Sequence, residues 1–388
     1  MKINSNMRLK KILIVIGTRP EAIKMAPLIH CLKKENNLFE IKVCVSGQHQ
    51  SMLTQALGIF DLKPDYNLDI MEPNQTLFTV TSKIIKKMEG ILSEFEPHLV
   101  LVHGDTTTTF TGAISSFYHK IPVGHIEAGL RTHNIYSPFP EEINRKLTSQ
   151  IATLHFAPTQ RSMDNLIKEG VSADKIIITG NTVIDALFLT LEKINNNIDT
   201  QKNILNDLEN KKYIFAENRR IVLVTGHRRE NFGTGFINIC KALKELAVKN
   251  TDVDIVYPVH LNPQVKIPVH QILGEISNIH LIEPLDYESF VYLMNQSHII
   301  ITDSGGVQEE APSLGKPVLV MRKNTERPEA LKAGTVKLVG TDKELIVSEA
   351  QKLLDNEEKY SKMSLASNPY GDGNASLRIV NFLKKELR

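Results

Sequence analysis

The chain has 388 residues, more than a single hydrophobic core usually serves, so we expect two domains. A hydrophobic fraction of 41%, a charged fraction of 23% and a formal net charge of +2 describe an ordinary globular protein and argue against nucleic acid or a membrane surface as a partner. Cys31, Cys44 and Cys240 are widely spaced in apolar patterns, which argues against a disulfide framework or a zinc site and suits reduced thiols in the cytoplasm.

The N-terminal segment 1–11 is basic and precedes the apolar run 12–16. That run is too short for a signal peptide, and it leads into Gly17-Thr-Arg-Pro-Glu rather than into a small-residue cleavage site. We therefore expect residues 12–16 to form the first strand of a cytoplasmic protein. No apolar run in the chain approaches the length of a membrane span.

Short apolar runs alternate with helix-length amphipathic segments along the whole chain, which is typical of parallel sheets wound with helices. Each run is nearly all apolar, as a strand covered on both faces must be. The ten expected strands lie at residues 12–16, 41–45, 99–102, 123–126, 176–178, 221–224, 254–259, 279–282, 299–302 and 318–321.

Residues 191–220 break this alternation and are expected to form a partly helical connection. On either side the chain restarts in the same way, with an apolar strand that ends in glycine. The sequence thus predicts an α/β fold of two doubly wound, Rossmann-like domains at residues 1–190 and 221–372, with a C-terminal helix at about 373–388 packed back on the first. Ligands of such sheets bind outside the carboxyl ends of the strands, so we expect the two domains to face each other across one cleft.

Charged residues follow the expected strands of the first domain. Arg19 ends the first strand and Lys24 lies in the next helix, where both could reach anionic oxygens or could be solvated cations of a capped helix start. Asp105 could project into the cleft or serve as a helix N-cap. His103 and Asp105 lack a third ligand at a recognised spacing, so no metal site is expected. Glu127 adds a carboxylate at the next strand end.

A helix start follows at 137–145, where Glu141 and Arg145, four residues apart, share a helix face. Taken alone, this spacing also fits a surface ion pair at a helix N-terminus. In the second domain, His227 stands beside two arginines at a strand end, where it could donate to an oxyanion or transfer a proton.

The segment 298–312 predicts a buried strand, a glycine-bearing turn and a helix start. Ser304, Gly305 and Gly306 can offer backbone N–H groups to a phosphate at the positive end of the helix dipole, and a glutamate one turn later suits ribose hydroxyls. The alternative is a tight turn with acidic residues at a helix N-terminus. No G-x-G-x-x-G pattern follows the first strand, so a nicotinamide cofactor is not expected.

Together these segments resemble the non-hydrolysing UDP-N-acetylglucosamine 2-epimerases, which are built on the glycosyltransferase-B scaffold. The likeness covers nearly the whole chain, in blocks at residues 17–28, 103–109, 124–131, 180–185, 226–230, 303–315 and 368–373. The resemblance implies reversible interconversion of UDP-N-acetylglucosamine and UDP-N-acetylmannosamine for surface polysaccharide synthesis, without NAD or a metal. UDP would be eliminated to leave 2-acetamidoglucal and would then add back.

The resemblance also implies roles for individual residues. Asp105, Glu127 and Glu141 would be the acid/base carboxylates, with base and acid not assigned among them, and Arg145 would hold Glu141. Lys24 would lie near the sugar, Glu310 would accept the ribose hydroxyls and Phe290 would lie by the uracil. The diphosphate cradle would comprise Arg19, His227, Ser304, Gly305 and Gly306.

Bacterial members of the family resemble one another in an activator pocket for a second UDP-N-acetylglucosamine, which here would comprise Gln48, His49, Gln75, His260 and Arg327. Ser51 and Asn74 depart from that pattern. A homodimer is also implied. A UDP-sugar glycosyltransferase, a hydrolysing epimerase and a catalytically idle sugar-nucleotide sensor are the alternatives on this scaffold; the three carboxylates favour the epimerase.

Overall fold

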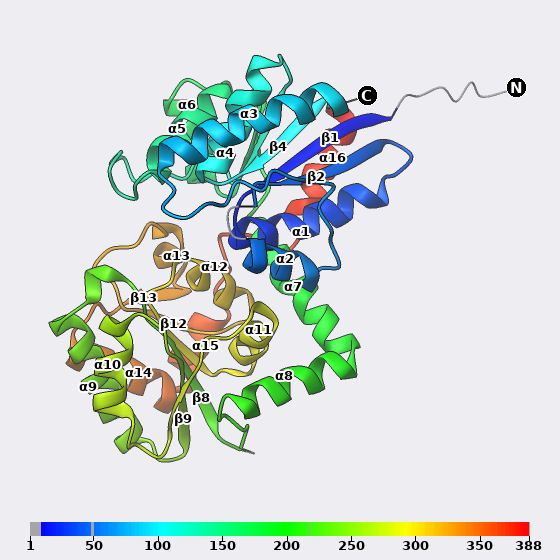
Figure 1. Cartoon of the computed structure of the whole chain (residues 1–388). Coiled ribbons are helices and arrows are strands. Elements are labelled where there is room, and N and C mark those ends of the chain that lie inside the picture. The colour runs from blue at the N-terminus through cyan, green and yellow to red at the C-terminus, as the bar shows by residue number, and fades with distance from the viewer. Residues whose placement is uncertain (1–8, 48–49, 217, 388) are drawn as a thin grey trace, which may run out of the picture. The chain divides into compact units, whose positions relative to one another are not determined.

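The computed structural model describes residues 9–47, 50–216 and 218–387 (Figure 1). These residues form two compact units. The first comprises the described residues up to Ala186 together with those from Tyr370 onward, and the second is Leu187–Pro369. The division falls within α7 (Thr182–Asn196), and residues 191–220 hold the end of that helix and all of α8 (Ile198–Asn210).

The first unit is built on a parallel sheet of seven strands in the order β3-β2-β1-β4-β5-β6-β7. Its central strands are buried on both faces, as their apolar sequences require, and Ile14 of β1 lies between Val43 of β2 and Leu101 of β4. The strands are β1 (Lys10–Ile16), β2 (Phe39–Val45), β3 (Tyr66–Asn67), β4 (Leu99–His103), β5 (Val123–Ile126), β6 (Leu154–Ala157) and β7 (Ile176–Ile178).

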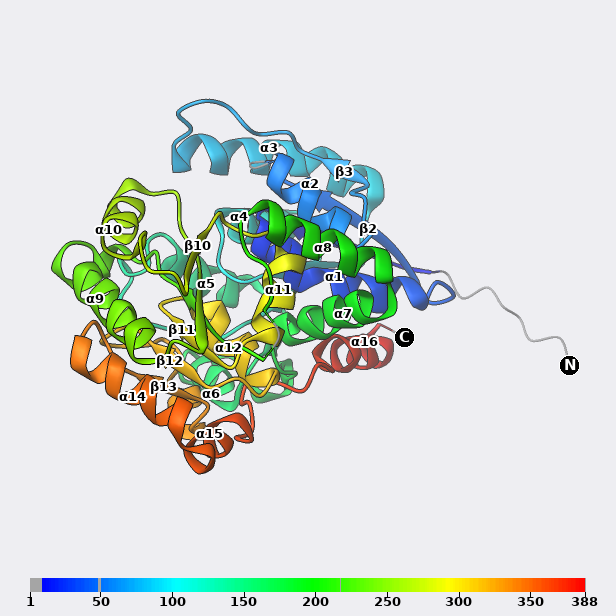
Figure 2. The same cartoon turned by 90° about the horizontal axis from the view of Figure 1, so that it is seen from below.

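Helices cover both faces of this sheet (Figures 1 and 2). One layer contains α3 (Leu77–Phe95), α4 (Thr107–Tyr118) and α5 (Glu141–Ile151), and the other contains α1 (Arg19–Lys34), α2 (Gln50–Ile59) and α16 (Ala375–Glu386). The C-terminal α16 packs on α1, and the Nζ of Lys384 lies 2.5 Å from a carboxylate oxygen of Glu35. The unit also contains α6 (Gln160–Lys168) and the short helix η1 (Ala173–Lys175).

The second unit has a parallel sheet of six strands in the order β10-β9-β8-β11-β12-β13. Helices α9 (Thr234–Lys249), α10 (Pro263–Leu273) and α14 (Lys343–Asp355) pack together on one face, and α11 (Tyr287–Gln296) and α12 (Gly305–Ser313) cover the other (Figure 2). The strands are β8 (Arg220–Thr225), β9 (Val253–Pro258), β10 (Ile279–Ile282), β11 (Ile299–Thr302), β12 (Val318–Val320) and β13 (Val336–Leu338). The remaining helices are η2 (Arg229–Asn231), α13 (Pro328–Ala333) and α15 (Glu357–Ser364).

Two parallel sheets covered by helices confirm the doubly wound α/β fold that the sequence predicts. All ten expected strands are present, with ends that differ by a few residues at most. The expected set lacks β3, β6 and β13 because these strands are short and carry polar residues, such as His155 in β6 and Lys337 in β13. In the part of the chain that the structure describes, no helix is both long and apolar enough to cross a membrane.

Candidate active site

The carboxyl ends of β1, β4, β5 and β7 bring a group of polar side chains together in the first unit. Glu127 follows β5 with a left-handed backbone, φ 63°. The Nζ of Lys24, from α1, lies 2.5 Å from the Oε1 of Glu127, and the Asn181 amide donates to the same oxygen at 2.8 Å. Burial raises the pKa of Glu127, but the charge of Lys24, the charge that His103 carries at acid pH and these hydrogen bonds outweigh burial and hold that pKa below its usual range. Glu127 is therefore a buried carboxylate kept ionised by a lysine.

His103, the last residue of β4, faces the same carboxylate. Its Nε2 lies 3.7 Å from the Oε2 of Glu127, and its side chain is buried. Within residues 9–47, 50–216 and 218–387, neither ring nitrogen finds a hydrogen-bond partner. Burial lowers the pKa of His103 to about 4, so the ring is neutral at neutral pH.

Asp105 is held at both its side chain and its backbone. The Nη2 of Arg145 lies 2.6 Å from the Oδ2 of Asp105, and the Asn144 amide donates to the Asp105 carbonyl at 2.9 Å. The alternative that Asp105 caps the following helix is wrong. Thr106 is the N-cap of α4, because its hydroxyl accepts the backbone N–H of Thr109. The Asp105 carboxylate therefore does not cap α4 and binds Arg145 instead.

The expected pairing of Arg145 with Glu141 is wrong. The Nη1 of Arg145 instead donates to the Oε2 of Glu142 at 3.1 Å, while Nη2 reaches Asp105. Helical spacing allowed either neighbour, and the loop before α5 decided between them by placing Glu142 beneath the backbone N–H groups of Thr132 and His133. The Oε2 of Glu141 is buried and has no hydrogen-bond partner among the described residues.

Arg19 begins α1, directly after the turn that follows β1. This turn is fixed by the buried Glu21, whose Oε2 accepts the backbone N–H groups of Gly17 at 3.0 Å and Thr18 at 2.6 Å. The other oxygen of Glu21 accepts the hydroxyl of Thr106 at 2.8 Å, so one carboxylate joins the turns after β1 and β4.

In the second unit, Asp303 at the end of β11 organises the strand ends. Its Oδ2 accepts the backbone N–H groups of His227 and Arg228, each at 2.9 Å, and its Oδ1 lies 3.2 Å from the Nδ1 of His227. Burial raises the pKa of Asp303. The hydrogen bonds with His227 and Arg228 and the charge of His227 lower that pKa by more than burial raises it, so it lies below its usual value. The contact between its Nδ1 and Asp303 thus orients the His227 ring, while the His227 side chain is 43% exposed.

The predicted strand, turn and helix of the anion site are present as β11, Ser304 and α12. Ser304 occupies the N-cap position, and its hydroxyl makes no capping hydrogen bond. A Cβ atom on Gly305 would lie 3.1 Å from the guanidinium carbon of Arg327, so a side chain at this position would press on that guanidinium. The Nε of Arg327 donates to Glu309 at 2.7 Å, which holds the cation against the start of α12.

Glu310 and Phe290 lie on neighbouring helices of the second unit. Glu310 on α12 is buried and accepts the hydroxyl of Tyr287 at 3.0 Å. Tyr287 begins α11, and Phe290, half-buried, follows three residues later in the same helix. The hydrogen bond from Tyr287 fixes one of the two Glu310 oxygens.

Of the residues expected to form an activator pocket, Gln48 and His49 lie outside the described residues. The Gln75 amide donates to the carbonyl of Ile70. The imidazole of His260 stacks on that of His227, with ring centroids 5.7 Å apart and planes at 22°. Arg327 lies against the turn that begins α12, as described above.

Several residues of these clusters were given no role from the sequence, among them Asn181, Asp303, Glu142 and Tyr287. Asn181 and Asp303 lie in the blocks 180–185 and 303–315, on which the family resemblance rests. Their position in these blocks was the sequence signal that could have found them. Glu142 stands beside Glu141 in the helix, and nothing local distinguishes the two. Tyr287 offered no signal, because its contact with Glu310 joins residues far apart in the chain.

Two doubly wound units, one with a carboxylate cluster at its strand ends and the other with a glycine-bearing turn between β11 and α12, define a protein with the glycosyltransferase-B fold. A glycosyltransferase for kitacinnamycin has this fold, with a TM-score of 0.66 at 10% identity.

The family follows from the sequence comparisons. A family model described as UDP-N-acetylglucosamine 2-epimerase matches residues 30–384. The UDP-N-acetylglucosamine 2-epimerase of Campylobacter jejuni is 58% identical over 97% of this chain and 98% of its own, and that of Escherichia coli K12 is 54% identical over 96% and 98%. The crystal structure of the Neisseria meningitidis enzyme bound to UDP-GlcNAc matches with a TM-score of 0.88 at 53% identity, over 97% of this chain and 100% of its own. The chain belongs to the UDP-N-acetylglucosamine 2-epimerase family and is an isomerase, which confirms the resemblance.

Proposed function

We propose that the protein interconverts UDP-N-acetylglucosamine and UDP-N-acetylmannosamine by elimination and re-addition of UDP. In the first step a carboxylate takes the C2 proton, the C1–C2 double bond forms and the C1–O bond breaks, which gives 2-acetamidoglucal and UDP. In the second step the opposite face of C2 is protonated and a UDP oxygen bonds to C1. The two steps balance without an oxidant or reductant, so we propose no cofactor.

The observation that carries this proposal is the set of carboxylates around the ends of β4 and β5. Glu127 is ionised and buried beside Lys24, Asp105 is fixed by Arg145, and Glu141 keeps a buried oxygen without a hydrogen-bond partner among the residues described. A C2 hydrogen lacks an adjacent carbonyl to activate it, so its removal needs positioned bases and a leaving group that departs at the same time. We assign the proton transfers to Asp105, Glu127 and Glu141.

The second unit supplies groups suited to the nucleotide. We propose that the diphosphate is stabilised by the backbone N–H groups of the 304–306 turn and by His227, with Arg19 of the first unit, because N–H donors and cations stabilise the charge that develops on a leaving diphosphate. Glu310 would accept the ribose hydroxyls and Phe290 would contact the uracil. Support comes from relatives: the Neisseria meningitidis structure is described as bound to UDP-GlcNAc, and a Methanocaldococcus jannaschii structure, 33% identical, as in complex with UDP-GlcNAc and UDP.

The test is incubation with UDP-N-acetylglucosamine in D2O, followed by NMR at C2. We expect deuterium at C2 and the appearance of UDP-N-acetylmannosamine without any acceptor. Free N-acetylmannosamine as the sole product would support a hydrolysing epimerase, and turnover only with an added acceptor would support a glycosyltransferase.

Replacing the carboxylates by amides tests the roles of the two units separately. Asp105→Asn or Glu141→Gln should lower turnover by at least about a hundredfold, because general acid–base catalysis is worth roughly that factor. UDP affinity, measured by calorimetry, should stay within about threefold, because its proposed contacts lie mainly in the second unit. Weaker UDP binding with retained turnover would reverse the assignment.

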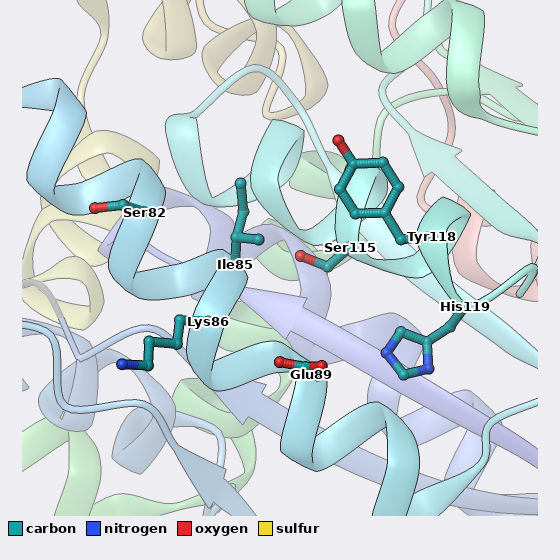
Figure 3. A pocket seen from close by; sticks show the side chains of 7 residues that line it. All are labelled: Ser82, Ile85, Lys86, Glu89, Ser115, Tyr118 and His119. Carbon is teal, nitrogen blue, oxygen red and sulfur yellow. The ribbon is translucent and has the colours of Figure 1, made fainter.

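We also propose that the protein forms a homodimer, for which the outer face of α3 and α4 offers a surface. Phe78, Phe117 and Tyr118 are 87%, 58% and 66% exposed there, and solvent-exposed aromatic groups of this kind suit an interface. A groove of about 500 Å³ between the two helices is lined by Ser82, Ile85, Lys86, Glu89, Ser115, Tyr118 and His119 (Figure 3). Lys86 and Glu89 in one groove could pair with their counterparts in a two-fold related copy. Tyr118→Glu should convert a dimer to a monomer in analytical ultracentrifugation.

The family resemblance motivates two further proposals. A second UDP-N-acetylglucosamine would activate the enzyme through Gln48, His49, Gln75, His260 and Arg327, and the product would serve surface polysaccharide synthesis. Activation predicts that UDP-N-acetylmannosamine alone is converted slowly until a small amount of UDP-N-acetylglucosamine is added. Equal rates with and without that addition would remove the activation proposal and leave the catalytic one intact.

A further inference from the structure

Glu142 is a buried carboxylate to which the proposed reaction gives no role. It is the second residue of α5, and its side chain is fully buried, whereas that of Asp105 is 26% exposed. Burying an ionised carboxylate is costly unless it is paired and hydrogen-bonded. The contacts that offset this cost therefore show what the carboxylate holds in place.

Both oxygens of Glu142 are occupied. Its Oε1 accepts the backbone N–H of His133 at 3.0 Å, and its Oε2 accepts the backbone N–H of Thr132 at 3.0 Å and the Nη1 of Arg145 at 3.1 Å. His133 has a left-handed backbone, φ 63°, which is unusual for a residue other than glycine. Glu142 thus joins the loop before α5 to one nitrogen of the arginine.

The other terminal nitrogen of Arg145 binds a proposed catalytic carboxylate, that of Asp105. Its Nη2 lies 2.6 Å from the Oδ2 of Asp105, and the neighbouring Asn144 donates to the Asp105 carbonyl at 2.9 Å. A planar guanidinium bound on two sides by carboxylates has little rotational freedom. Arg145 thus divides its contacts between two carboxylates, those of Glu142 and Asp105.

We infer that Glu142 is a positioning residue for the epimerase reaction. It holds Arg145 in the one arrangement that fixes the Asp105 carboxylate, and it leaves the adjacent Glu141 oxygen free of Arg145. This inference rests on the proposed function, because it assigns Asp105 and Glu141 to proton transfer. A purely structural role in anchoring the loop to α5 would predict lower thermal stability with unchanged turnover of the folded enzyme.

The test is Glu142→Gln in the full chain, assayed by C2 deuterium incorporation and by steady-state kinetics. We expect kcat to fall by about 30-fold, because a displacement of about 1 Å in a catalytic group can cost up to about a hundredfold. KM should change by less than about threefold, and UDP affinity by calorimetry should be unchanged because the proposed UDP contacts lie mainly in the other unit. A kcat within about twofold of the wild type in the folded variant would overturn the inference.

Glu169→Gln is the matched control. Glu169 also holds an arginine of the first unit, accepting from the Nε of Arg131 at 2.9 Å and from its Nη2 at 2.7 Å, but it contacts none of the proposed catalytic carboxylates. The control should lose thermal stability and keep kcat within about twofold. An equal loss of kcat in both variants would show a general effect of weakening the domain and would overturn the inference.

A double-mutant cycle with Arg145→Lys tests whether Glu142 acts through the arginine. If it does, the double variant should lose no more kcat than Arg145→Lys alone, whereas additive losses would contradict the proposed route. Should Glu142→Gln fail to fold, Glu142→Asp keeps the charge but withdraws the carboxylate by one methylene, and wild-type kcat in that variant would equally overturn the inference. Absence of deuterium at C2 in the wild type would refute the proposed function itself, which separates the two failures.

Discussion

Replacement of Lys24 by methionine should destabilise the first unit and make its stability depend on pH in a new way. The pair with Glu127 is close, 2.5 Å, and poorly accessible, with 17% of the lysine side chain and 8% of the glutamate side chain exposed. At an effective dielectric constant of about 20, the direct attraction at this separation is about 7 kcal/mol, most of which offsets the cost of desolvating the two ions. Removing only the lysine leaves a buried charge, which typically costs about 3–5 kcal/mol.

We expect a loss near the lower end, about 3 kcal/mol at pH 7, because Asn181 still donates to Glu127. In the wild type the folded pKa of Glu127 lies below its usual value of 4.5, so the ion pair stabilises the protein above pH 4.5 and this contribution is lost as the pH falls through the folded pKa. In Lys24→Met, burial acts without the cation and raises that pKa, so the variant becomes less stable as the pH rises above 4.5. The penalty should therefore shrink by about 1 kcal/mol between pH 7 and pH 5.

Hydrogen exchange of the β4 and β5 amides is the assay, because it reports the first unit separately from the second in a two-unit protein. Lys24→Met, Glu127→Gln and the double variant should be compared at pH 5 and pH 7. The double variant should be more stable at pH 7 than Lys24→Met, because no uncompensated charge remains. Equal protection of wild type and Lys24→Met, or a penalty that does not change with pH, would refute the view that Lys24 keeps Glu127 ionised.

Two further predictions concern the second unit and the thiols. Gly305→Val should lower UDP affinity by at least about tenfold, since a side chain there meets the guanidinium of Arg327 at the proposed diphosphate-binding turn. Gly58→Ala, whose added Cβ meets nothing within 4 Å, should leave UDP affinity unchanged in calorimetry. Burial raises the pKa of Cys44 and of Cys240 to about 12, so a thiol reagent at pH 8 should modify only Cys31 in the folded protein and all three cysteines in denaturant. Fast modification of two or three thiols without denaturant would contradict the burial of Cys44 and Cys240.

Local sequence was sufficient for the elements that carry the fold. The runs at residues 12–16 and 299–302 are apolar throughout because strands covered on both faces must be, and the glycines and charged residues that follow them mark strand ends. In a parallel sheet all those ends lie at one edge, so the grouping of Asp105 with Glu127, and of His227 with Ser304, could be predicted before the structure.

The partners of individual side chains could not be read from spacing. A position four residues away along a helix suggested Glu141 for Arg145, yet the arginine binds Glu142 and Asp105, because the loop 129–140 and the turn after β4 supply the other donors and acceptors. Asp303 behind His227 and Tyr287 behind Glu310 were missed for the same reason. Periodicity along the chain determines which face of an element is buried, whereas the pairing of charges across that face depends on distances between segments far apart in sequence, which only the folded chain sets.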